Sequence, residues 1–245
     1  MIEKQWFSEW FDTSYYHILY KNRDDDEAKS FINQLVQFLK LPTDDLPVLD
    51  LACGKGRHSV TLNSLGYTVL GADLSANSIA EANQSSNENL SFIVHDMREA
   101  IEETKFQAVF NLFTSFGYFD DQSDNEKVLN SIHSMLSKDG VLVIDFMNAT
   151  KIIVELVTEE EKTVDGIKFN LKRNHDGNHI FKHINFEDDS KKFSYTERVQ
   201  ALQLSDFSKL LSKTGFDLIR TFGDFQLNSF DAETSSRLIL IAKKV

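Results

Sequence analysis

Five short apolar runs divide the first 150 residues of the chain, and stretches with helical spacing of apolar positions separate them. Their length and the turn residues around them are typical of buried strands. The clearest amphipathic stretch, residues 124–136, predicts a helix capped by Ser123 or Asp124. Strands alternating with helices predict an α/β fold with a parallel sheet covered on both faces. The runs cover residues 48–52, 69–73, 92–97, 106–113 and 140–146.

The flanking regions follow other patterns. Residues 1–41 predict two helical pieces rich in aromatic side chains, an N-terminal helical cap. Residues 151–204 contain three stretches that alternate with period two, and they predict an inserted antiparallel three-stranded β meander. This meander suits two roles, a lid over the substrate or the surface of a homodimer. Residues 205–245 predict a helix capped by Ser205 and two strands that complete the core sheet of residues 42–150.

The first apolar run leads into a glycine turn, in the sequence Val-Leu-Asp-Leu-Ala-Cys-Gly-Lys-Gly-Arg-His-Ser at 48–59. Open α/β sheets bind nucleotide-like ligands at such a turn, because glycine lets a ligand touch the backbone. The third small residue of a dinucleotide fingerprint is replaced by Ser59, so that fingerprint is incomplete. Asp50, four residues before Gly54, would repel a pyrophosphate but suits a ligand that carries an ammonium group.

Two more of the predicted strands end in an acid, at Asp73 and at Asp96. Together with Asp50 and the pattern Asp-x-x-x-Gly-x-Gly, they resemble the nucleotide-binding loop of class I S-adenosylmethionine-dependent methyltransferases. The resemblance covers residues 47–148 well. It implies a Rossmann-like, doubly wound sheet of seven mostly parallel strands with the last strand antiparallel, and S-adenosylmethionine as the cofactor.

The resemblance also implies a role for each strand end. Asp50 would orient the methionine ammonium, and Asp73 would accept hydrogen bonds from the ribose hydroxyls. Leu74 and Met97 would face the adenine, while Asp96 would accept from its exocyclic amine. The whole implied cofactor set is Asp50, Ala52, Gly54, Gly56, Asp73, Leu74, Asp96, Met97 and Phe113.

The methyl acceptor is expected at the carboxyl end of the fourth strand, where residues 114–119 are aromatic and rich in hydroxyls. Ser115 and Tyr118 are the candidates there. The segment lacks the Asn/Asp-Pro-Pro-aromatic pattern of enzymes that methylate base or amide nitrogens. From the N-terminal cap, Tyr15 and Tyr16 are further substrate candidates, although core packing is the simpler explanation of these aromatic residues. The candidates for a general base are His17, Tyr118 and Asp145.

Composition narrows the possible partners. The net charge of −12 over 245 residues, without a basic run, argues against nucleic acid. One cysteine, Cys53, cannot form an intramolecular disulfide, and no signal-peptide or membrane-spanning pattern is evident, so a cytoplasmic location is expected. No metal site is expected. His179 and His183 lie about 13 Å apart on a strand, too far to share an ion.

We therefore expect a methyltransferase that transfers a methyl group from S-adenosylmethionine to the nitrogen or oxygen of a small molecule. Such a displacement relies on positioning, which can supply about 7–11 kcal/mol of the barrier, rather than on covalent catalysis. Two alternatives stay open at this point. One is an NAD-dependent oxidoreductase of similar architecture, and the other is a non-catalytic protein that binds S-adenosylmethionine.

Overall fold

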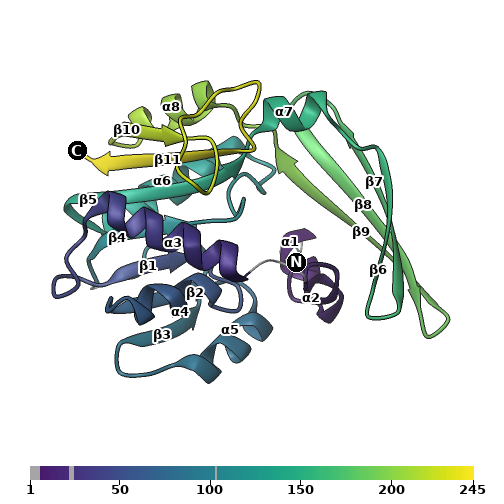
Figure 1. Cartoon of the computed structure of the whole chain (residues 1–245), viewed down its shortest axis with the longest axis horizontal. Helices are drawn as coiled ribbons and strands as arrows, with labels where there is room; N and C mark the ends of the chain where they lie inside the picture. Colours follow the sequence, from purple (N-terminus) through teal and green to yellow (C-terminus); the bar gives the residue numbers. More distant parts are fainter. Residues whose placement is uncertain (1–5, 22–24, 103) are drawn as a thin grey trace.

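The computed structural model describes residues 6–21, 25–102 and 104–245, and its strands form two separate sheets (Figure 1). The larger sheet has seven strands in the order β10-β11-β5-β4-β1-β2-β3. β11 runs antiparallel to both of its neighbours, and the other pairs in this sheet are parallel. The predicted Rossmann-like sheet with an antiparallel last strand is therefore confirmed. Its strands are β1 (Val48–Leu51), β2 (Val69–Asp73), β3 (Leu90–Val94), β4 (Phe106–Asn111), β5 (Leu136–Met147), β10 (Phe216–Phe222) and β11 (Arg237–Lys244).

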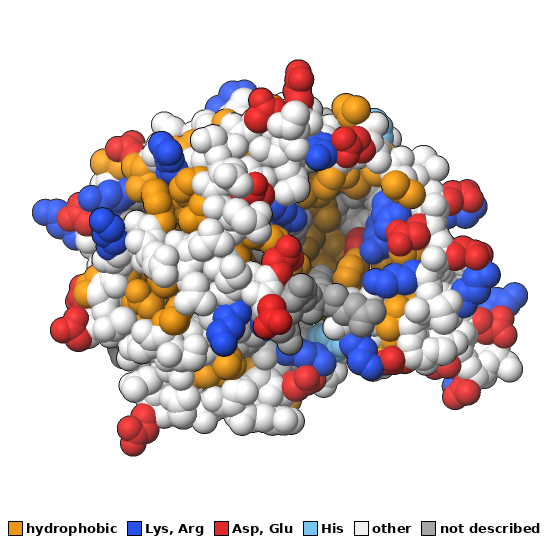
Figure 2. Space-filling model, in the orientation of Figure 1, with side chains coloured by type: hydrophobic (Ala, Val, Ile, Leu, Met, Phe, Trp, Pro, Cys, Tyr) orange, Lys and Arg blue, Asp and Glu red, His pale blue; other side chains and the backbone are white. Residues whose placement is uncertain are grey.

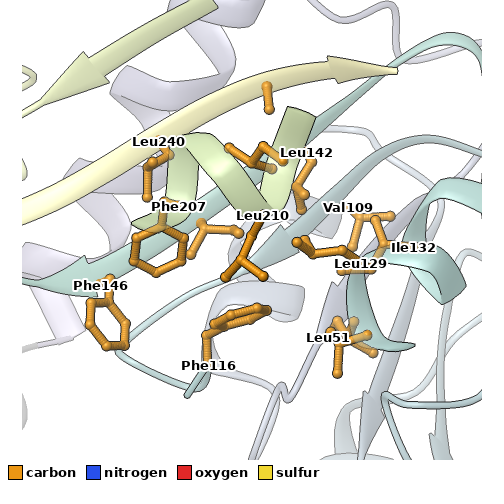
Figure 3. Packing of buried hydrophobic residues seen from close by; sticks show 14 of the residues in the cluster. Leu51, Val109, Phe116, Leu129, Ile132, Leu142, Phe146, Phe207, Leu210 and Leu240 are labelled. Carbon is orange, nitrogen blue, oxygen red and sulfur yellow. The ribbon is translucent and has the colours of Figure 1, made fainter. Parts of the chain in front are cut away.

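Helices cover both faces of the large sheet, because each helix buries one apolar stripe against it. One hydrophobic cluster joins the sheet to α3 (Asp25–Leu39), α4 (Arg57–Ser64) and α5 (Ala76–Ala82), which a short 3₁₀ turn (Asn83–Ser85) follows. The other cluster joins it to α6 (Gln122–Met135) and α8 (Leu204–Lys213). Figure 3 shows Phe207 and Leu210 of α8 beside Leu240, Phe146 and Leu142 of the sheet.

The inserted element is a four-stranded antiparallel sheet in sequential order, β6 (Glu159–Val164), β7 (Ile167–His175), β8 (His179–Asp188) and β9 (Lys191–Gln200). The sequence predicted the last three strands and missed β6, so the expected number of three was wrong. β6 reads Glu-Glu-Glu-Lys-Thr-Val and is exposed over most of its length. A charged edge strand resists pairing with other chains, but it carries no apolar alternation that could reveal it.

The N-terminal helices α1 (Trp6–Trp10) and α2 (Ser14–Leu19) lie between the two sheets (Figure 1). Trp10 and Leu19 pack into a hydrophobic cluster with one face of the small sheet. On the other side, Asp12 accepts hydrogen bonds from Ser75 Oγ at 2.6 Å and Asn77 N at 3.1 Å, at the start of α5. The cap thus packs against the small sheet on one side and is hydrogen-bonded to the start of α5 on the other. α7 (Ala149–Val154) follows β5 and precedes the small sheet.

Several element boundaries differ from those expected. α6 begins at Gln122 rather than at residue 124, because the Asp121 carboxylate accepts from Ser123 N at 2.8 Å and caps the helix. α8 is capped by Gln203 through a reciprocal bond with Asp206, and not by Ser205. β4 ends at Asn111, two residues early, because Phe113 and Thr114 adopt positive φ angles of 61° and 60°.

Candidate active site

A cavity of about 690 Å³ lies beyond the carboxyl ends of β1 to β4, and α1 and α2 line its other side. Figure 2 shows a hollow between the two sheets with hydrophobic side chains on its inner surface. The volume lies in the range of cavities that hold small molecules. Most of the expected site residues come together on its wall, namely Tyr16, His17, Ala52, Gly54, Asp73, Leu74, Asp96, Met97, Phe113, Ser115 and Tyr118.

The two glycines of the turn serve different purposes. Gly54 has a φ of +55°, and a Cβ added there would meet no atom within 4 Å, so its backbone faces open space in the cavity wall. Gly56 has a φ of +81°, but a Cβ there would lie 2.6 Å from the Phe92 ring. Gly56 does not line the cavity. Its glycine is needed for packing of the turn against β3, and only Gly54 offers bare backbone to a ligand.

Asp73 ends β2 and joins the glycine turn to the start of α5. Its carboxylate accepts from Gly54 N at 2.8 Å and from Ser75 N at 2.8 Å, one bond to each oxygen. Burial raises the pKa of Asp73, while these backbone bonds act in the opposite direction. Each oxygen keeps a lone pair for a further donor, and the residue lines the cavity. The arrangement suits a ligand with two neighbouring hydroxyl groups.

Asp50 lies behind the cavity wall and not on it. It is buried in β1 and accepts from Ser59 Oγ at 2.6 Å. Burial raises the pKa of Asp50 to about 6, although the Ser59 bond lowers it. Ser59, which breaks the dinucleotide fingerprint, therefore has a structural purpose in this chain, since it satisfies the buried carboxylate.

The third acid, Asp96, has a cationic partner. Arg98 Nε and Nη2 approach its carboxylate at 3.0 and 2.5 Å. Burial alone would raise the pKa of Asp96, but the bonds from Arg98 more than offset this and hold the pKa below its usual value. Arg98 also contacts Asp124 of α6 at 3.2 Å. Asp96 is therefore an ionised acceptor held in a fixed orientation beside Met97.

Aromatic side chains surround the other end of the cavity. The Tyr118 ring contacts the Trp6 ring at 5.4 Å and the Phe11 ring at 5.2 Å between centroids. His17 Nε2 lies 3.5 Å from Ser78 Oγ of α5. Ser115 Oγ donates to Leu112 O at 2.8 Å. The cap and the loop after β4 thus build this end together.

Besides Asp50 and Gly56, two further expected residues lie away from the cavity wall. Tyr15 packs on Phe186 and Phe193 of the small sheet, and its hydroxyl donates to Asp188 at 2.9 Å. Asp145 of β5 is fully buried and pairs with Arg237 at 2.8 Å. Neither residue lines the cavity.

The cavity wall also contains residues that sequence reasoning did not select as site residues, among them Phe7, Phe11, Tyr20 and Arg57. Arg57 starts α4 directly after the glycine turn, and its guanidinium lies 4.7 Å from the centre of the Phe113 ring. Its place beside the turn was a signal that could have revealed it. Tyr20 donates to Glu197 at 2.8 Å, a partner 177 residues away, and no local pattern could indicate that contact.

The part of the chain that the structure describes gives little support for a reactive thiol or for a metal site. Burial raises the pKa of the Cys53 thiol, so this side chain stays protonated. Residues 6–21, 25–102 and 104–245 contain no group of three His, Cys, Asp or Glu side chains that could hold a metal ion. Within the same ranges, no helix has both the length and the hydrophobicity of a membrane span.

Comparison with known proteins agrees with this geometry. The model of a methyltransferase domain family matches residues 42–197. The chain is 30% identical over 205 residues to a glycine/sarcosine N-methyltransferase of Aphanothece halophytica, covering 80% of this chain and 76% of that protein. Among solved structures, an S-adenosylmethionine-dependent methyltransferase from Clostridium acetobutylicum has a TM-score of 0.79 at 19% identity, covering 94% and 96% of the two chains. CalS10, an amino pentose methyltransferase from Micromonospora echinaspora, has a TM-score of 0.70 at 17% identity, covering 95% and 98%.

The chain belongs to the class I S-adenosylmethionine-dependent methyltransferases. It is an enzyme with S-adenosylmethionine as its cofactor, and the oxidoreductase alternative is not favoured. The residues fit that cofactor on structural grounds. Gly54 presents open backbone to the cavity, and Asp73 offers a carboxylate with spare lone pairs beside it.

Proposed function

We propose that this enzyme methylates the amine nitrogen of a small molecule. The observation that carries the proposal is the cavity itself, which joins the glycine turn to an aromatic end within one volume of about 690 Å³. A cavity of this size is typical of sites that hold small molecules. The names of the similar glycine/sarcosine N-methyltransferase and of CalS10 point to amines as acceptors in those proteins.

The aromatic end supports an amine in particular. Phe7, Phe11, Tyr16 and Tyr118 line it. A neutral amine gains positive charge as it takes up a methyl group, and the faces of aromatic rings attract cations by about 0.5–2 kcal/mol. An alcohol would have to lose a proton instead, and would gain less from these rings.

We further propose how the cofactor-binding residues act. S-adenosylmethionine supplies an electrophilic methyl group on a sulfonium. Gly54 and Ala52 would contact its methionine part, and Asp50, behind them, would attract the ammonium through its charge. Asp73 would hold the ribose hydroxyls. Leu74 and Met97 would pack on the adenine, Asp96 would accept from its amine, and Phe113 would close the wall.

For the acceptor, Tyr16, Ser115 and Tyr118 are the proposed contacts. A general base must reach the proton that it removes within hydrogen-bond distance. His17 and Tyr118 line the cavity and stay candidates for that role. An amine that arrives without its extra proton needs such a base only after the methyl transfer.

Calorimetry and turnover test the proposal together. Titration with S-adenosylhomocysteine should give saturable binding, while NADH should give none. A panel of small primary and secondary amines should then yield methylated products by mass spectrometry, and matched alcohols should not. Methylation of the alcohols alone would contradict the proposal. Tight cofactor binding without any product from either panel would favour the non-catalytic alternative.

Three further points belong to the proposal. Nucleic acid is not the acceptor, since a net charge of −12 opposes binding to phosphates. The enzyme works in the cytoplasm, which fractionation can test.

A homodimer, if it forms, uses the face of the small sheet opposite the cap, where Lys172, His183 and Thr196 are neighbours in register. Light scattering of the purified protein tests that state.

A further inference from the structure

The segment after β4 holds an unfavourable backbone conformation at the cavity wall. Phe113 and Thr114 both have left-handed φ angles, of 61° and 60°. A residue with a Cβ pays roughly 1–2 kcal/mol for this conformation, and a β-branched threonine is a clear outlier there. Two such residues in succession persist only where surrounding contacts impose them.

Asp145 and Arg237 supply those contacts. The Asp145 carboxylate accepts from Phe113 N at 2.9 Å, and its backbone oxygen accepts from Thr114 N at 2.9 Å. Arg237 donates from Nε to the other carboxylate oxygen at 2.8 Å and from Nη2 to Thr114 Oγ1 at 2.9 Å. Two strands, β5 and β11, therefore hold both strained residues through the backbone of Asp145 and through an ion pair whose carboxylate is buried.

The ring that this arrangement places is part of the cavity wall. Phe113 lines the cavity next to Arg57, whose guanidinium lies over its ring at 4.7 Å. The Phe113 ring also stacks on Phe225 at 5.8 Å with an interplanar angle of 22°. Arg237 also lies over the Phe225 ring at 5.5 Å. Arg237 thus supports the backbone of Phe113 through Asp145, and it also lies against the Phe225 ring that stacks on Phe113.

We propose that Asp145 and Arg237 are a positioning pair, which fixes Phe113 in the wall of the cofactor site by imposing the left-handed conformation on residues 113 and 114. Asp145 is not a catalytic residue. Its side chain is fully buried, it is absent from the cavity wall, and both of its carboxylate oxygens accept hydrogen bonds inside the protein. A general base has to reach the acceptor, and this carboxylate does not.

The pair can be tested by titration with S-adenosylhomocysteine, without any methyl acceptor. Asp145→Asn and Arg237→Gln should each raise the dissociation constant about tenfold, as for loss of one bond to a charged group. Each single variant leaves the other charge buried without its partner. The double variant should therefore lose much less than the product of the two single losses.

Glycine rescue separates positioning from a general loss of stability. Glycine adopts a φ near +60° without cost. Thr114→Gly in the Asp145→Asn background should recover part of the lost affinity, although it removes the hydroxyl that Arg237 binds. A matched control is Asp139→Asn, which removes an exposed ion pair with Lys243 (3.0 Å) at the opposite end of the same two strands. This variant should bind like the wild type.

Two results would overturn the proposal. One is an unchanged dissociation constant in Asp145→Asn and Arg237→Gln while the free energy of unfolding falls, which would make the pair purely structural. The other is additive losses without glycine rescue. If Asp145→Asn does not fold, the dissociation constants of Arg237→Lys and of the single variant Thr114→Gly are compared with that of the wild type instead. Wild-type protein titrated in parallel shows whether S-adenosylhomocysteine binds at all. The test of the pair does not depend on which amine is methylated.

Discussion

The two ends of the cavity are built in different ways. The end with the glycine turn comes from one stretch of chain, residues 50–97, in which an acid lies at or near the end of each of three successive strands: Asp50 within β1, Asp73 at the end of β2 and Asp96 two residues after β3. The aromatic end comes from the cap, from the loop after β4 and, behind them, from the small sheet. The first end depends on local turns at neighbouring strand ends. The second depends on contacts between segments more than 100 residues apart, such as Trp10 with Glu197 at 2.7 Å.

This difference suggests a division of tasks. The end with the glycine turn, which we propose binds the cofactor, is fixed by backbone and buried acids and has little freedom to change. The aromatic end is formed by a cap that side-chain contacts hold against the small sheet. Substitutions in the cap or in the small sheet can therefore reshape this end. The comparison predicts that variants at the first end alter cofactor affinity and core stability, and that variants at the second alter the acceptor.

The largest expected effect is the pH dependence of stability that Asp50 causes. Its pKa is about 6 in the folded protein against 3.8 in a model peptide, so the folded chain binds this proton more tightly than the unfolded chain. The resulting contribution is fully present below about pH 4 and is lost as the pH rises through about 6. It amounts to about 3 kcal/mol.

Asp50→Asn should remove this dependence. The difference in free energy of unfolding, wild type minus variant, should fall by about 3 kcal/mol between roughly pH 4 and pH 7, measured by urea denaturation. A difference that does not vary with pH would mean that Asp50 titrates normally.

Asp73→Ala addresses the cofactor directly. It should weaken binding of S-adenosylhomocysteine by about 1.5–3 kcal/mol, the cost of lost hydrogen bonds to a charged group. The acceptor KM, measured at saturating cofactor, should stay the same. An unchanged affinity in calorimetry would place the ribose elsewhere in the cavity.

The two glycines of the turn give a matched pair of substitutions. Gly56→Ala forces a Cβ against the Phe92 ring and should cost about 1–3 kcal/mol of stability. Gly54→Ala meets open space in the protein, so it should cost less stability and should weaken S-adenosylhomocysteine binding more. Thermal unfolding and calorimetry on both variants check the contrast. Equal effects of the two on both quantities would contradict the separate roles.

At the acceptor end, Glu197→Gln should have a smaller effect. Glu197 accepts from Trp10 and Tyr20 of the cap region and lies 3.9 Å from Lys182. Loss of its charge should lower the free energy of unfolding by about 1 kcal/mol and make the cap more sensitive to proteolysis. Affinity for S-adenosylhomocysteine should change less than in Asp73→Ala.

Two further variants serve as controls, the first for Glu197→Gln and the second for the proposed acceptor contacts. Glu159→Gln, in an exposed pair with Lys172 at 3.0 Å, should change neither stability nor proteolysis. Tyr15→Phe should leave the acceptor KM unchanged, because this ring packs on the small sheet and does not line the cavity.

Much of the end of the cavity with the glycine turn could be predicted because its signals are local. The acids at 50, 73 and 96 each follow a short apolar run, and the strands of a parallel sheet present their carboxyl ends at one edge. The same reasoning could not tell Gly54 from Gly56, because the Phe92 ring that fills the space beside Gly56 comes from another strand. Nor could it tell that Asp145, also at a strand end, faces Arg237 rather than the cavity.

The sequence by itself determined the class of fold and the cofactor, and it predicted the edge of the sheet where that cofactor would bind. Short-range periodicity and turn chemistry suffice for these features. Only the tertiary structure decided which face of the small sheet the cap covers, and what holds Phe113 in a left-handed conformation. It also decided that Tyr16 lines the cavity while Tyr15 packs on the small sheet. These outcomes depend on side chains that meet across 100 residues or more, such as Tyr15 with Asp188 and Thr114 with Arg237. No local sequence pattern encodes these contacts, because each of them contributes free energy only when both side chains are in place.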